Sequence, residues 1–408
     1  MNLSTISPIS GQRRGTRLLW SEGTTAAFTR RGNETLVAEG GHPLVAGPLG
    51  ITMRLGAGAL NLIANPSFEV DAAGWGLNGA GTQSLTRITS DAYSGSACAS
   101  VTTDGSVGGQ GLIWNGTRPA ATAGVAYTIS GWSKGVSGSS LLRIGMEFYD
   151  VDGGFLAGFN APYTMSSAWT RATFTATAPA NTASVRPYYR VHNAVAATYR
   201  VDALQLEARA YASIYCDGSL GDGHAWSGTA HASVSTRDAS RLRGDGAALA
   251  ASMGGCFAWL RPEWPSTDAG EHVVLHWNMD ATHNSCVAAT GSGTWRARWI
   301  DGGVTSSTEV AASHGSGDSL LLAVGWTPRV IMIQIGAARI EVARATSPST
   351  MDSARQFDIG RRSDASSGYA DAAIGPIVLL GAPPSTHAVI VAQALSAPPP
   401  WGACLLAS

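Results

Sequence analysis

Short runs of alternating apolar and polar residues dominate the chain between residues 59 and 210. A period of two places successive side chains on opposite faces, which predicts β-strands that bury one face. Gly-rich turns separate the runs, and turn chemistry accounts for Asp150 and Asp152 without a metal or catalytic role. The predicted strands are 110–114, 126–133, 141–150, 170–176, 185–192 and 198–207.

A second region of strand-length apolar runs follows at residues 241–396. Its predicted strands are 256–262, 273–277, 295–300, 319–326, 330–335, 357–360 and 374–380. We expect a short helix at 388–395. The proline run 398–400 ends regular structure, so residues 397–408 form a C-terminal tail.

Residues 1–58 carry only small apolar runs, at 18–20, 35–38 and 43–46, broken by Gly and Pro. Such strands are too few to enclose a core of their own. An exposed strand edge readily pairs with another chain. We therefore predict that this segment docks the protein onto a larger particle or onto sister copies.

These patterns predict an all-β chain with two β-sandwich, jelly-roll domains at 59–210 and 241–396. A connector at 211–240 joins them, and a short β-rich N-terminal segment precedes them. Composition agrees, because 408 residues are too many for one core. Charged residues make up 13% and Gly numbers 50, which suits sandwiches with many tight turns.

Several classes of partner are disfavoured by charge and run length. The net charge of −1 supplies no basic field for nucleic acid. The longest apolar runs, 320–324 and 330–335, are far too short to span a bilayer. Residues 1–17 show no signal-peptide pattern. The five cysteines form no C-x-x-C pair, which favours buried thiols over a metal site.

No enzyme motif is visible. The chain lacks a G-x-S-x-G turn, an H-E-x-x-H helix and a phosphate-binding glycine loop. His231, Asp217 and nearby serines could suggest a triad, but packing of a Gly-rich connector is the favoured interpretation. We predict that the protein is not an enzyme.

Two motifs delimit the first domain. Residues 61–69 read Asn-Leu-Ile-Ala-Asn-Pro-Ser-Phe-Glu and open it, and residues 201–207 read Val-Asp-Ala-Leu-Gln-Leu-Glu and close it. With Trp75, Trp132 and Trp169 between them, the arrangement resembles the jelly-roll carbohydrate-binding modules that accompany polysaccharide hydrolases and recur in bacteriophage tail proteins. In that family the three tryptophans occupy packing positions, so the resemblance implies that they belong to the core.

The resemblance also implies one structural calcium ion, with Glu69 and Asp202 as its ligands and Asp91 as a further candidate. Carboxylates with backbone carbonyls suit this hard cation. The alternative is that Glu69 and Asp202 only accept backbone hydrogen bonds or pair with arginines.

Sugar binding in such modules uses aromatic rings with polar groups beside them. The candidates on predicted strands of the first domain are Trp114, Tyr149, Tyr188 or Tyr189, and Arg143, with Arg186 and Arg190 nearby. Adjacent Tyr188 and Tyr189 point to opposite faces, so only one can line a groove. We choose Tyr189. Core packing is the competing role for every one of these rings.

The rest of the chain adds two resemblances. Tyr215-x-Asp217-Gly218, Trp226-x-Gly228 and His231-x-Ser-x-Ser resemble the connector after such modules in phage tail proteins. The second region resembles laminin-G-like and concanavalin-like sandwiches. Its carbohydrate-binding candidates are Trp277 and Trp299, with Asp280 and Trp295 as comparable ones.

The leading interpretation is a structural component of a phage or phage-like particle, at the tail, tail tip or fibre. It would bind a host cell-surface glycan, together with other virion proteins and sister copies in a homo-oligomer such as a trimer. Localisation would be the virion, assembled in a bacterial cytoplasm and then extracellular. Two alternatives stay open: an accessory module of a polysaccharide-degrading enzyme, and a virion spacer or decoration protein that binds no glycan.

Overall fold

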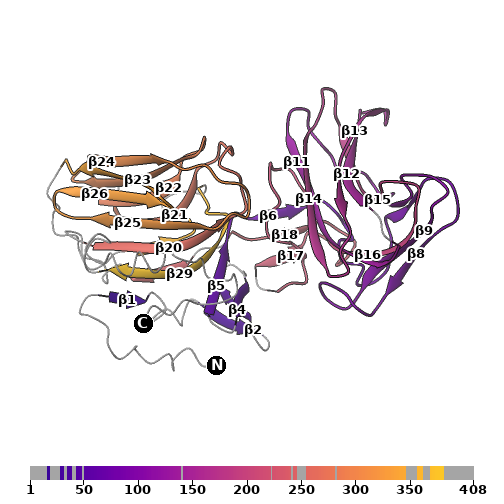
Figure 1. Cartoon of the computed structure of the whole chain (residues 1–408), viewed down its shortest axis with the longest axis horizontal. Coiled ribbons are helices and arrows are strands. Elements are labelled where there is room, and N and C mark those ends of the chain that lie inside the picture. The colour runs from indigo at the N-terminus through magenta and orange to yellow at the C-terminus, as the bar shows by residue number, and fades with distance from the viewer. Residues whose placement is uncertain are drawn as a thin grey trace. The chain divides into compact units, whose positions relative to one another are not determined.

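Every regular element that the computed structural model describes is a β-strand, which confirms the all-β prediction (Figure 1). The strands form two compact units, here called the first unit (Ala59–Arg237) and the second unit (Met1–Gly58 with Asp238–Ser408). Within the described part, no helix is long and apolar enough to cross a membrane. The described residues are 16–18, 28–31, 35–38, 43–47, 50–138, 141–221, 223–239, 242–245, 254–280, 283–345, 356–361 and 368–380.

The first unit contains two five-stranded antiparallel sheets and a small three-stranded one. The front sheet has the order β13 (Phe155–Thr164), β12 (Leu141–Tyr149), β15 (Ser184–Val191), β10 (Gly111–Trp114) and β7 (Trp75–Asn78). The back sheet has the order β14 (Thr170–Thr177), β11 (Ala126–Ser137), β16 (Ala196–Glu207), β9 (Cys98–Asp104) and β8 (Gln83–Ile88). The small sheet joins β17 (His224–Trp226), β18 (Ser235–Arg237) and β6 (Ala59–Asn61).

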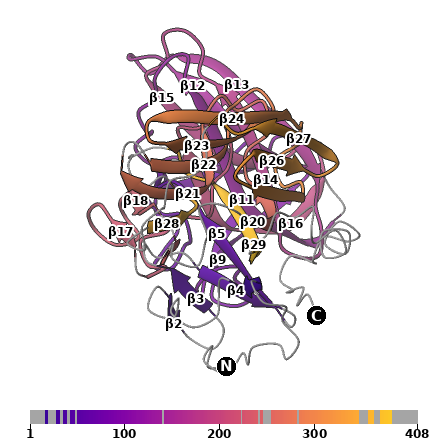
Figure 2. The same ribbon diagram turned by 90° about the vertical axis from the view of Figure 1, so that its left-hand side faces the viewer.

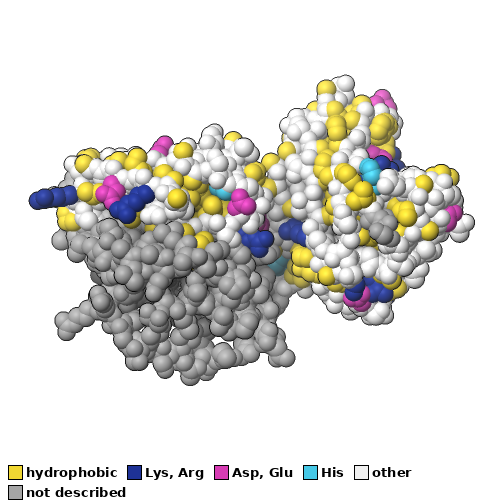
Figure 3. Space-filling view, viewed as in Figure 1, with side chains coloured by type: hydrophobic (Ala, Val, Ile, Leu, Met, Phe, Trp, Pro, Cys, Tyr) yellow, Lys and Arg dark blue, Asp and Glu magenta, His cyan; other side chains and the backbone are white. Residues whose placement is uncertain are grey.

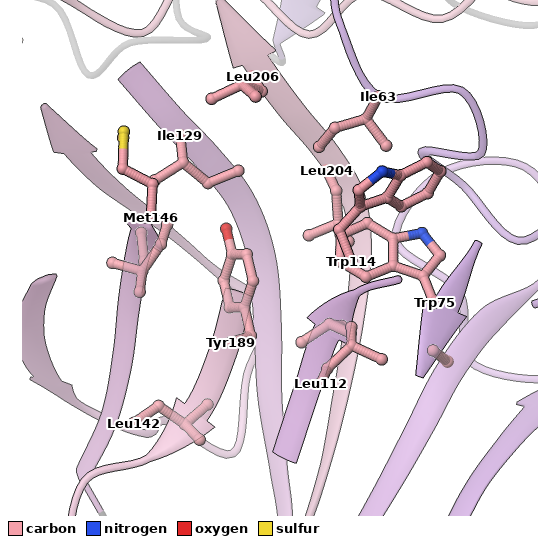
Figure 4. Packing of buried hydrophobic residues seen from close by; sticks show 14 of the residues in the cluster. Ile63, Trp75, Leu112, Trp114, Ile129, Leu142, Met146, Tyr189, Leu204 and Leu206 are labelled. Atoms are coloured by element: carbon pink, nitrogen blue, oxygen red, sulfur yellow. The ribbon is translucent and has the colours of Figure 1, made fainter. Parts of the chain in front are cut away.

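The core of the first unit lies between its front and back sheets (Figure 4). Alternation along β12 turns Leu142, Ile144, Met146 and Phe148 inward, and all four are buried. Burying one such side chain stabilises the fold by about 1.5–3 kcal/mol, so this stripe fixes the register of the strand.

One hydroxyl group joins the two sheets across this core. Tyr199, on the back sheet, donates its hydroxyl hydrogen to the Tyr189 carbonyl oxygen (2.9 Å) and accepts from the Leu112 amide (3.3 Å) on the front sheet. Gly111 makes room for it, because a Cβ there would lie 2.3 Å from the Tyr199 hydroxyl. The phenol thus bridges two backbone groups of β10 and β15.

The second unit also contains two antiparallel sheets (Figure 2). Strands β23 and β24 of one sheet contact β26 and β27 of the other, which gives the predicted sandwich. The first sheet has the order β19 (Leu242–Asp245), β28 (Gln356–Ile359), β21 (His272–Asp280), β22 (His283–Ala289), β23 (Thr294–Asp301) and β24 (Val304–Ala311). The second has the order β2 (Phe28–Arg31), β3 (Thr35–Ala38), β4 (Pro43–Gly47), β5 (Gly50–Leu55), β29 (Ala372–Leu380), β20 (Gly254–Pro262), β25 (Leu320–Trp326), β26 (Val330–Ile335) and β27 (Ala338–Ala343), and β1 (Thr16–Leu18) also pairs with β29.

The division into units differs from the predicted domain boundaries at two places. Strand β5 pairs with β29, with Leu55 opposite Ala372, so residues 1–58 group with the second sandwich. Strand β18 pairs with β6, so most of the predicted connector 211–240 groups with the first unit. The predicted helix at 388–395 and the tail at 397–408 lie outside the described residues.

Two buried tyrosines of the first unit give a matched test of this packing. Tyr199→Phe leaves the Leu112 amide and one lone pair of the Tyr189 carbonyl without the bridge, which should lower the free energy of unfolding by about 2 kcal/mol. The Tyr189 hydroxyl is buried without a hydrogen-bond partner, so Tyr189→Phe should be neutral or slightly stabilising. Urea unfolding of the full chain measures both, and equal losses would contradict the bridging role.

Candidate functional site

The outer face of the front sheet carries an ordered group of charged and aromatic side chains. On β12 and β15, the residues that alternate with the core positions point away from the core. Strand register then sets Arg143 opposite Arg190, and Glu147 opposite Arg186. On the face drawn in Figure 3, the charged side chains of the described residues are few and scattered. Several arginines close together on one sheet face therefore distinguish that face from the rest of the surface.

Glu147 is the centre of this group. Its Oε1 accepts from Arg190 Nη2 at 2.8 Å, and its Oε2 accepts from the Tyr149 hydroxyl at 2.7 Å. Arg186 Nη1 lies 3.8 Å from Oε2. One carboxylate is therefore shared by two guanidiniums, and these side chains hold one another in fixed positions.

Pro187 explains why Arg186 adopts its orientation. The Val191 amide donates to the Gln110 carbonyl, so antiparallel alternation makes Trp114 and Pro187 the last hydrogen-bonded pair of β10 and β15. Proline has no amide hydrogen to donate to the Trp114 carbonyl. Arg186 Nε donates to that oxygen instead, at 2.6 Å, and Nη2 donates to Asn115 Oδ1.

A pocket of about 480 Å³ opens beside this arginine. Tyr149 borders the group: the Arg118 Cζ lies 3.5 Å from its ring centroid, and the Phe155 ring meets it edge-on at 5.8 Å. Phe155 is 62% exposed and Val151 is 85% exposed, so the hairpin between β12 and β13 presents apolar surface here. The pocket is lined by Trp114, Asn115, Gly116, Arg118, Asp150, Val151, Gly153, Ser184 and Arg186.

Tyr188 is the outward-facing member of the tyrosine pair, so the choice of Tyr189 was wrong. Tyr189 is fully buried in the core (Figure 4). Tyr188 lies on the outer face, under Arg190, whose Cζ is 3.9 Å from the ring centroid, and above Gly145. A Cβ at Gly145 would lie 2.6 Å from the Tyr188 hydroxyl, so only glycine leaves room for this ring.

The structure brings three of the remaining predicted residues to or near this face. Tyr149 and Arg143 share the outer face, although the Tyr149 ring is mostly covered. Trp114 packs in the core and only borders the pocket (Figure 4). Sequence reasoning missed Arg118, Asn115 and Phe155, which lie in loops or begin an edge strand.

The carbohydrate-binding candidates Trp277 and Trp299 of the second unit lie in its core, so the prediction that they bind sugar was wrong. Trp277 and Trp299 are 4% and 2% exposed, and both contact Trp326 of the facing sheet, with centroids 5.6 and 5.3 Å apart. Trp295 is buried against Trp264. The side chain of Asp280 lies outside the described residues. Tryptophans that fill the space between two sheets cannot stack on a sugar.

The three tryptophans expected in the first core divide between core and surface. Trp75 is buried and donates its indole hydrogen to the Asn65 carbonyl at 2.7 Å. Trp132 is half-buried on the outer face of the back sheet, where it stacks on Tyr93 at 3.7 Å. Trp169, also half-buried, approaches the same Tyr93 ring. The core assignment was therefore right for Trp75 and wrong for the other two.

Glu69 and Asp202 both bind the loop that precedes β9. Asp202 Oδ2 accepts from the amides of Tyr93 (2.8 Å) and Ser94 (2.9 Å). Glu69 Oε1 accepts from the amides of Ser96 (2.9 Å) and Ala97 (3.1 Å). Burial raises the pKa of Asp202 to about 7, and the negative charge of Glu69 adds to the rise.

These two carboxylates fit a cation only in part. Asp202 Oδ1 and Glu69 Oε2 each accept one hydrogen bond, so each keeps one lone pair. No cluster of three or more His, Cys, Asp or Glu side chains occurs among the described residues, so further ligands would be backbone carbonyls or water. Asp91 pairs instead with Lys134 (2.7 Å) and Arg200, so its negative charge is already neutralised by these cations.

The motif 61–69 and the connector are joined by buried polar side chains. Asn61 donates to the carbonyls of Leu204 (2.9 Å) and Cys216 (3.0 Å) and accepts from the amides of Ile63 and Leu206. Ser67 donates to Asp217 Oδ2 at 2.7 Å. Each segment therefore supplies hydrogen-bond partners for buried polar groups of the other.

The connector residues Ser219 and His231 resemble two members of a catalytic triad but, within the described part of the chain, lack the carboxylate that would hold the histidine. Ser219 Oγ lies 3.2 Å from His231 Nε2 and also accepts the Trp226 indole hydrogen at 3.1 Å. Among the described residues, the buried His231 Nδ1 has no hydrogen-bond partner. Without a carboxylate on Nδ1, nothing orients the imidazole as a triad requires.

Comparison with known proteins gives one family match, over residues 60–194, to the family described as carbohydrate binding domain. No curated protein matches the chain. Among solved structures, the CBM22-1 xylan-binding domain of Xyn10C from Paenibacillus barcinonensis is 21% identical (38% of this chain, 97% of that chain, TM-score 0.31). The CBM22-1–CBM22-2 tandem domain of the same protein is 15% identical (79% and 98%, TM-score 0.32). The enzymatically active domain of tailspike protein 4 from bacteriophage CBA120 is 12% identical (36% and 21%, TM-score 0.31).

The calcium prediction can be tested by chelation. Calcium at about 100 times its Kd would add about 2.7 kcal/mol to the stability of the first unit. EGTA should then lower the Tm of that unit by about 5–10 °C. Asp202→Asn should remove this sensitivity, whereas Asp152→Asn, in an exposed turn, should keep it. Identical calorimetric melting of the parent protein with and without EGTA would mean that both carboxylates serve only the loop.

Proposed function

We propose that the first unit is a non-catalytic glycan-binding module. The observation that carries the proposal is the outer face of the front sheet, where fixed polar groups stand beside a pocket and an exposed aromatic ring. Sugar ligands need this combination, because hydroxyl groups require placed donors and acceptors and ring faces require apolar contact. The family match over residues 60–194 supports it.

The pocket offers both kinds of contact. Asn115, Ser184 and Arg186 present hydrogen-bonding groups, and Asp150 presents a carboxylate. Arg186 is already held by the Trp114 carbonyl, so little side-chain entropy is lost when a ligand binds. Phe155 and Val151 give an apolar border on the β12–β13 hairpin. A sugar ring in the pocket would contact Val151, and a longer glycan could extend from the pocket onto Phe155.

Two groups of side chains that could suggest catalysis each lack a feature that catalysis needs. Both Glu147 oxygens already accept hydrogen bonds, from Arg190 and Tyr149. A glycosidase needs a carboxyl group free to give a proton to its substrate. The Ser219–His231 pair lacks a partner on His231 Nδ1 within the described residues.

For the biological setting, we propose a virion component that displays this module to a host cell-surface glycan, in several copies. The connector pattern at Tyr215, Trp226 and His231 supports this setting by its resemblance. Strand β2 lies at the edge of its sheet among the described strands, and such an edge can pair with another chain. Weak sugar contacts gain from multiple copies. Immunogold labelling of purified particles with an antibody to this protein should decorate them, and unlabelled particles would contradict the setting.

Glycan binding is tested with the full chain by affinity electrophoresis in a broad panel of soluble polysaccharides. We expect retardation by at least one of them. Phe155→Ala should weaken binding about tenfold, or about 1.4 kcal/mol, because the exposed ring packs on Tyr149 beside the pocket. Val136→Ala, equally a loss of an exposed apolar side chain but on β11 of the back sheet, should bind as the parent does.

Two results would contradict the proposal. Failure to bind any polysaccharide in the panel would overturn glycan binding. Steady release of reducing ends from a bound polysaccharide would overturn the non-catalytic part.

A further inference from the structure

We infer that the pocket of the first unit selects an acidic glycan, by binding the carboxylate of a uronic acid to Arg118. The inference rests on the proposed function and names the substrate class of that same site.

Positive charge exceeds negative charge on this face. Arg118 and Arg186 line the pocket, and Arg143 and Arg190 lie opposite each other on the same face, four residues farther along β12 and β15. Opposite them are two carboxylates, those of Glu147 and Asp150. Asp152, in the same turn, does not line the pocket. Among the residues that line the pocket, the guanidiniums of Arg118 and Arg186 face one carboxylate, that of Asp150, which leaves an excess of one positive charge that a ligand anion can neutralise.

Neither carboxylate is available to Arg118. Glu147 is shared by Arg186 and Arg190. Asp150 Oδ1 accepts from the amides of Asp152 (3.0 Å) and Gly154 (2.7 Å), so it stabilises its own turn. Among the described residues, Arg118 makes no hydrogen bond and no ion pair, and its one contact of this kind is with the Tyr149 ring.

The geometry of Arg118 suits a carboxylate. Its guanidinium lies over the Tyr149 ring, with Cζ 3.5 Å from the centroid, and this cation–π contact steadies the group without using its N–H donors in a hydrogen bond. A planar guanidinium presents parallel N–H groups that match the two oxygens of a carboxylate. Tyr149 itself is fixed by its hydrogen bond to Glu147. Arg118 is therefore positioned before the ligand arrives.

The size of the pocket and its border suit a sugar that carries the carboxylate. A volume of about 480 Å³ falls within the range of roughly 300–1,000 Å³ that is usual for ligand pockets. Asn115 and Ser184 can bind ring hydroxyls, and Val151 can contact the ring. A uronic acid combines these features in one residue, with its carboxylate toward Arg118.

The test compares acidic polymers with their own neutral forms. The full chain is titrated with polygalacturonate, alginate and hyaluronan, and with the same polymers after chemical reduction of their carboxyl groups to alcohols. Reduction keeps the linkages and replaces each carboxylate with a neutral hydroxymethyl group. We expect at least one acidic polymer to bind ten times more tightly than its reduced form, and more weakly as salt rises.

Two substitutions assign that preference to Arg118. Arg118→Gln should remove the tenfold difference and lower Tm only slightly, because this side chain makes no hydrogen bond to the rest of the described chain and loses only its contact with the Tyr149 ring. Arg118→Lys keeps the charge but loses the planar fork, and should give an intermediate difference. Arg339→Gln, on β27 of the second unit, makes the same charge change and should have no effect.

Each result has one meaning. Equal affinity for acidic and reduced polymers overturns the acidic-glycan inference and leaves the proposed function in place. Binding to no polymer in this set and to neutral polysaccharides only overturns it as well, and binding to no polysaccharide at all overturns both. Tighter binding to sulfated polymers, such as dextran sulfate, than to every uronate polymer overturns the assignment of a carboxylate. A preference for uronates that survives Arg118→Gln overturns the role of Arg118.

Discussion

The first unit depends on the buried side chain of Asn61. Its amide makes four hydrogen bonds, to Leu204 and Leu206 on β16 and to Ile63 and Cys216 on either side. A buried amide that lost any of these would leave a polar group unpaired, at a cost of about 1–3 kcal/mol for each. This one residue therefore holds the opening motif, the closing strand and the connector together, and the loop bound by Glu69 and Asp202 is attached to the same region.

At the front sheet, a missing hydrogen-bond donor determines the site. Pro187 cannot bond to the Trp114 carbonyl, so Arg186 takes the vacant place and β10 ends. The chain then turns away through Asn115 and Arg118, and the pocket lies between this turn and the β12–β13 hairpin. Because Arg186 donates where a backbone amide normally would, the pocket forms at the end of β10, and the Arg186 guanidinium is held at its edge.

Part of the fold followed from periodicity alone. Strands such as β11, β12 and β16 alternate cleanly and are central in their sheets, so their burial leaves a strong pattern. Strand β13 was missed because it lies at an edge, where Gly158 and Pro162 interrupt its pattern and both faces are largely exposed. Of the N-terminal strands, β3 and β4 match predicted runs, whereas β2 and β5 were not predicted. The pairing of β5 with β29 joins segments more than 300 residues apart, which no local pattern encodes.

The residues of the front-sheet site could be predicted from the sequence only where they belong to a strand with a clear alternating pattern. Val185 and Val191 share a face with Tyr189, so their burial could have assigned Tyr189 to the core and Tyr188 to the outer face. The buried state of Trp277 depends on Trp326 in the facing sheet, and the position of Arg118 depends on a loop. Both are tertiary contacts that the sequence does not reveal.

Hydrogen–deuterium exchange of the full chain, with and without a saturating concentration of the polysaccharide that binds most tightly, tests the central claim most directly. If the pocket on the front sheet binds glycan, amides of residues 114–118 and 150–155 should exchange more slowly with the polymer present, while those of β14 on the back sheet stay unchanged. Protection confined to the back sheet or to the second unit would contradict this account.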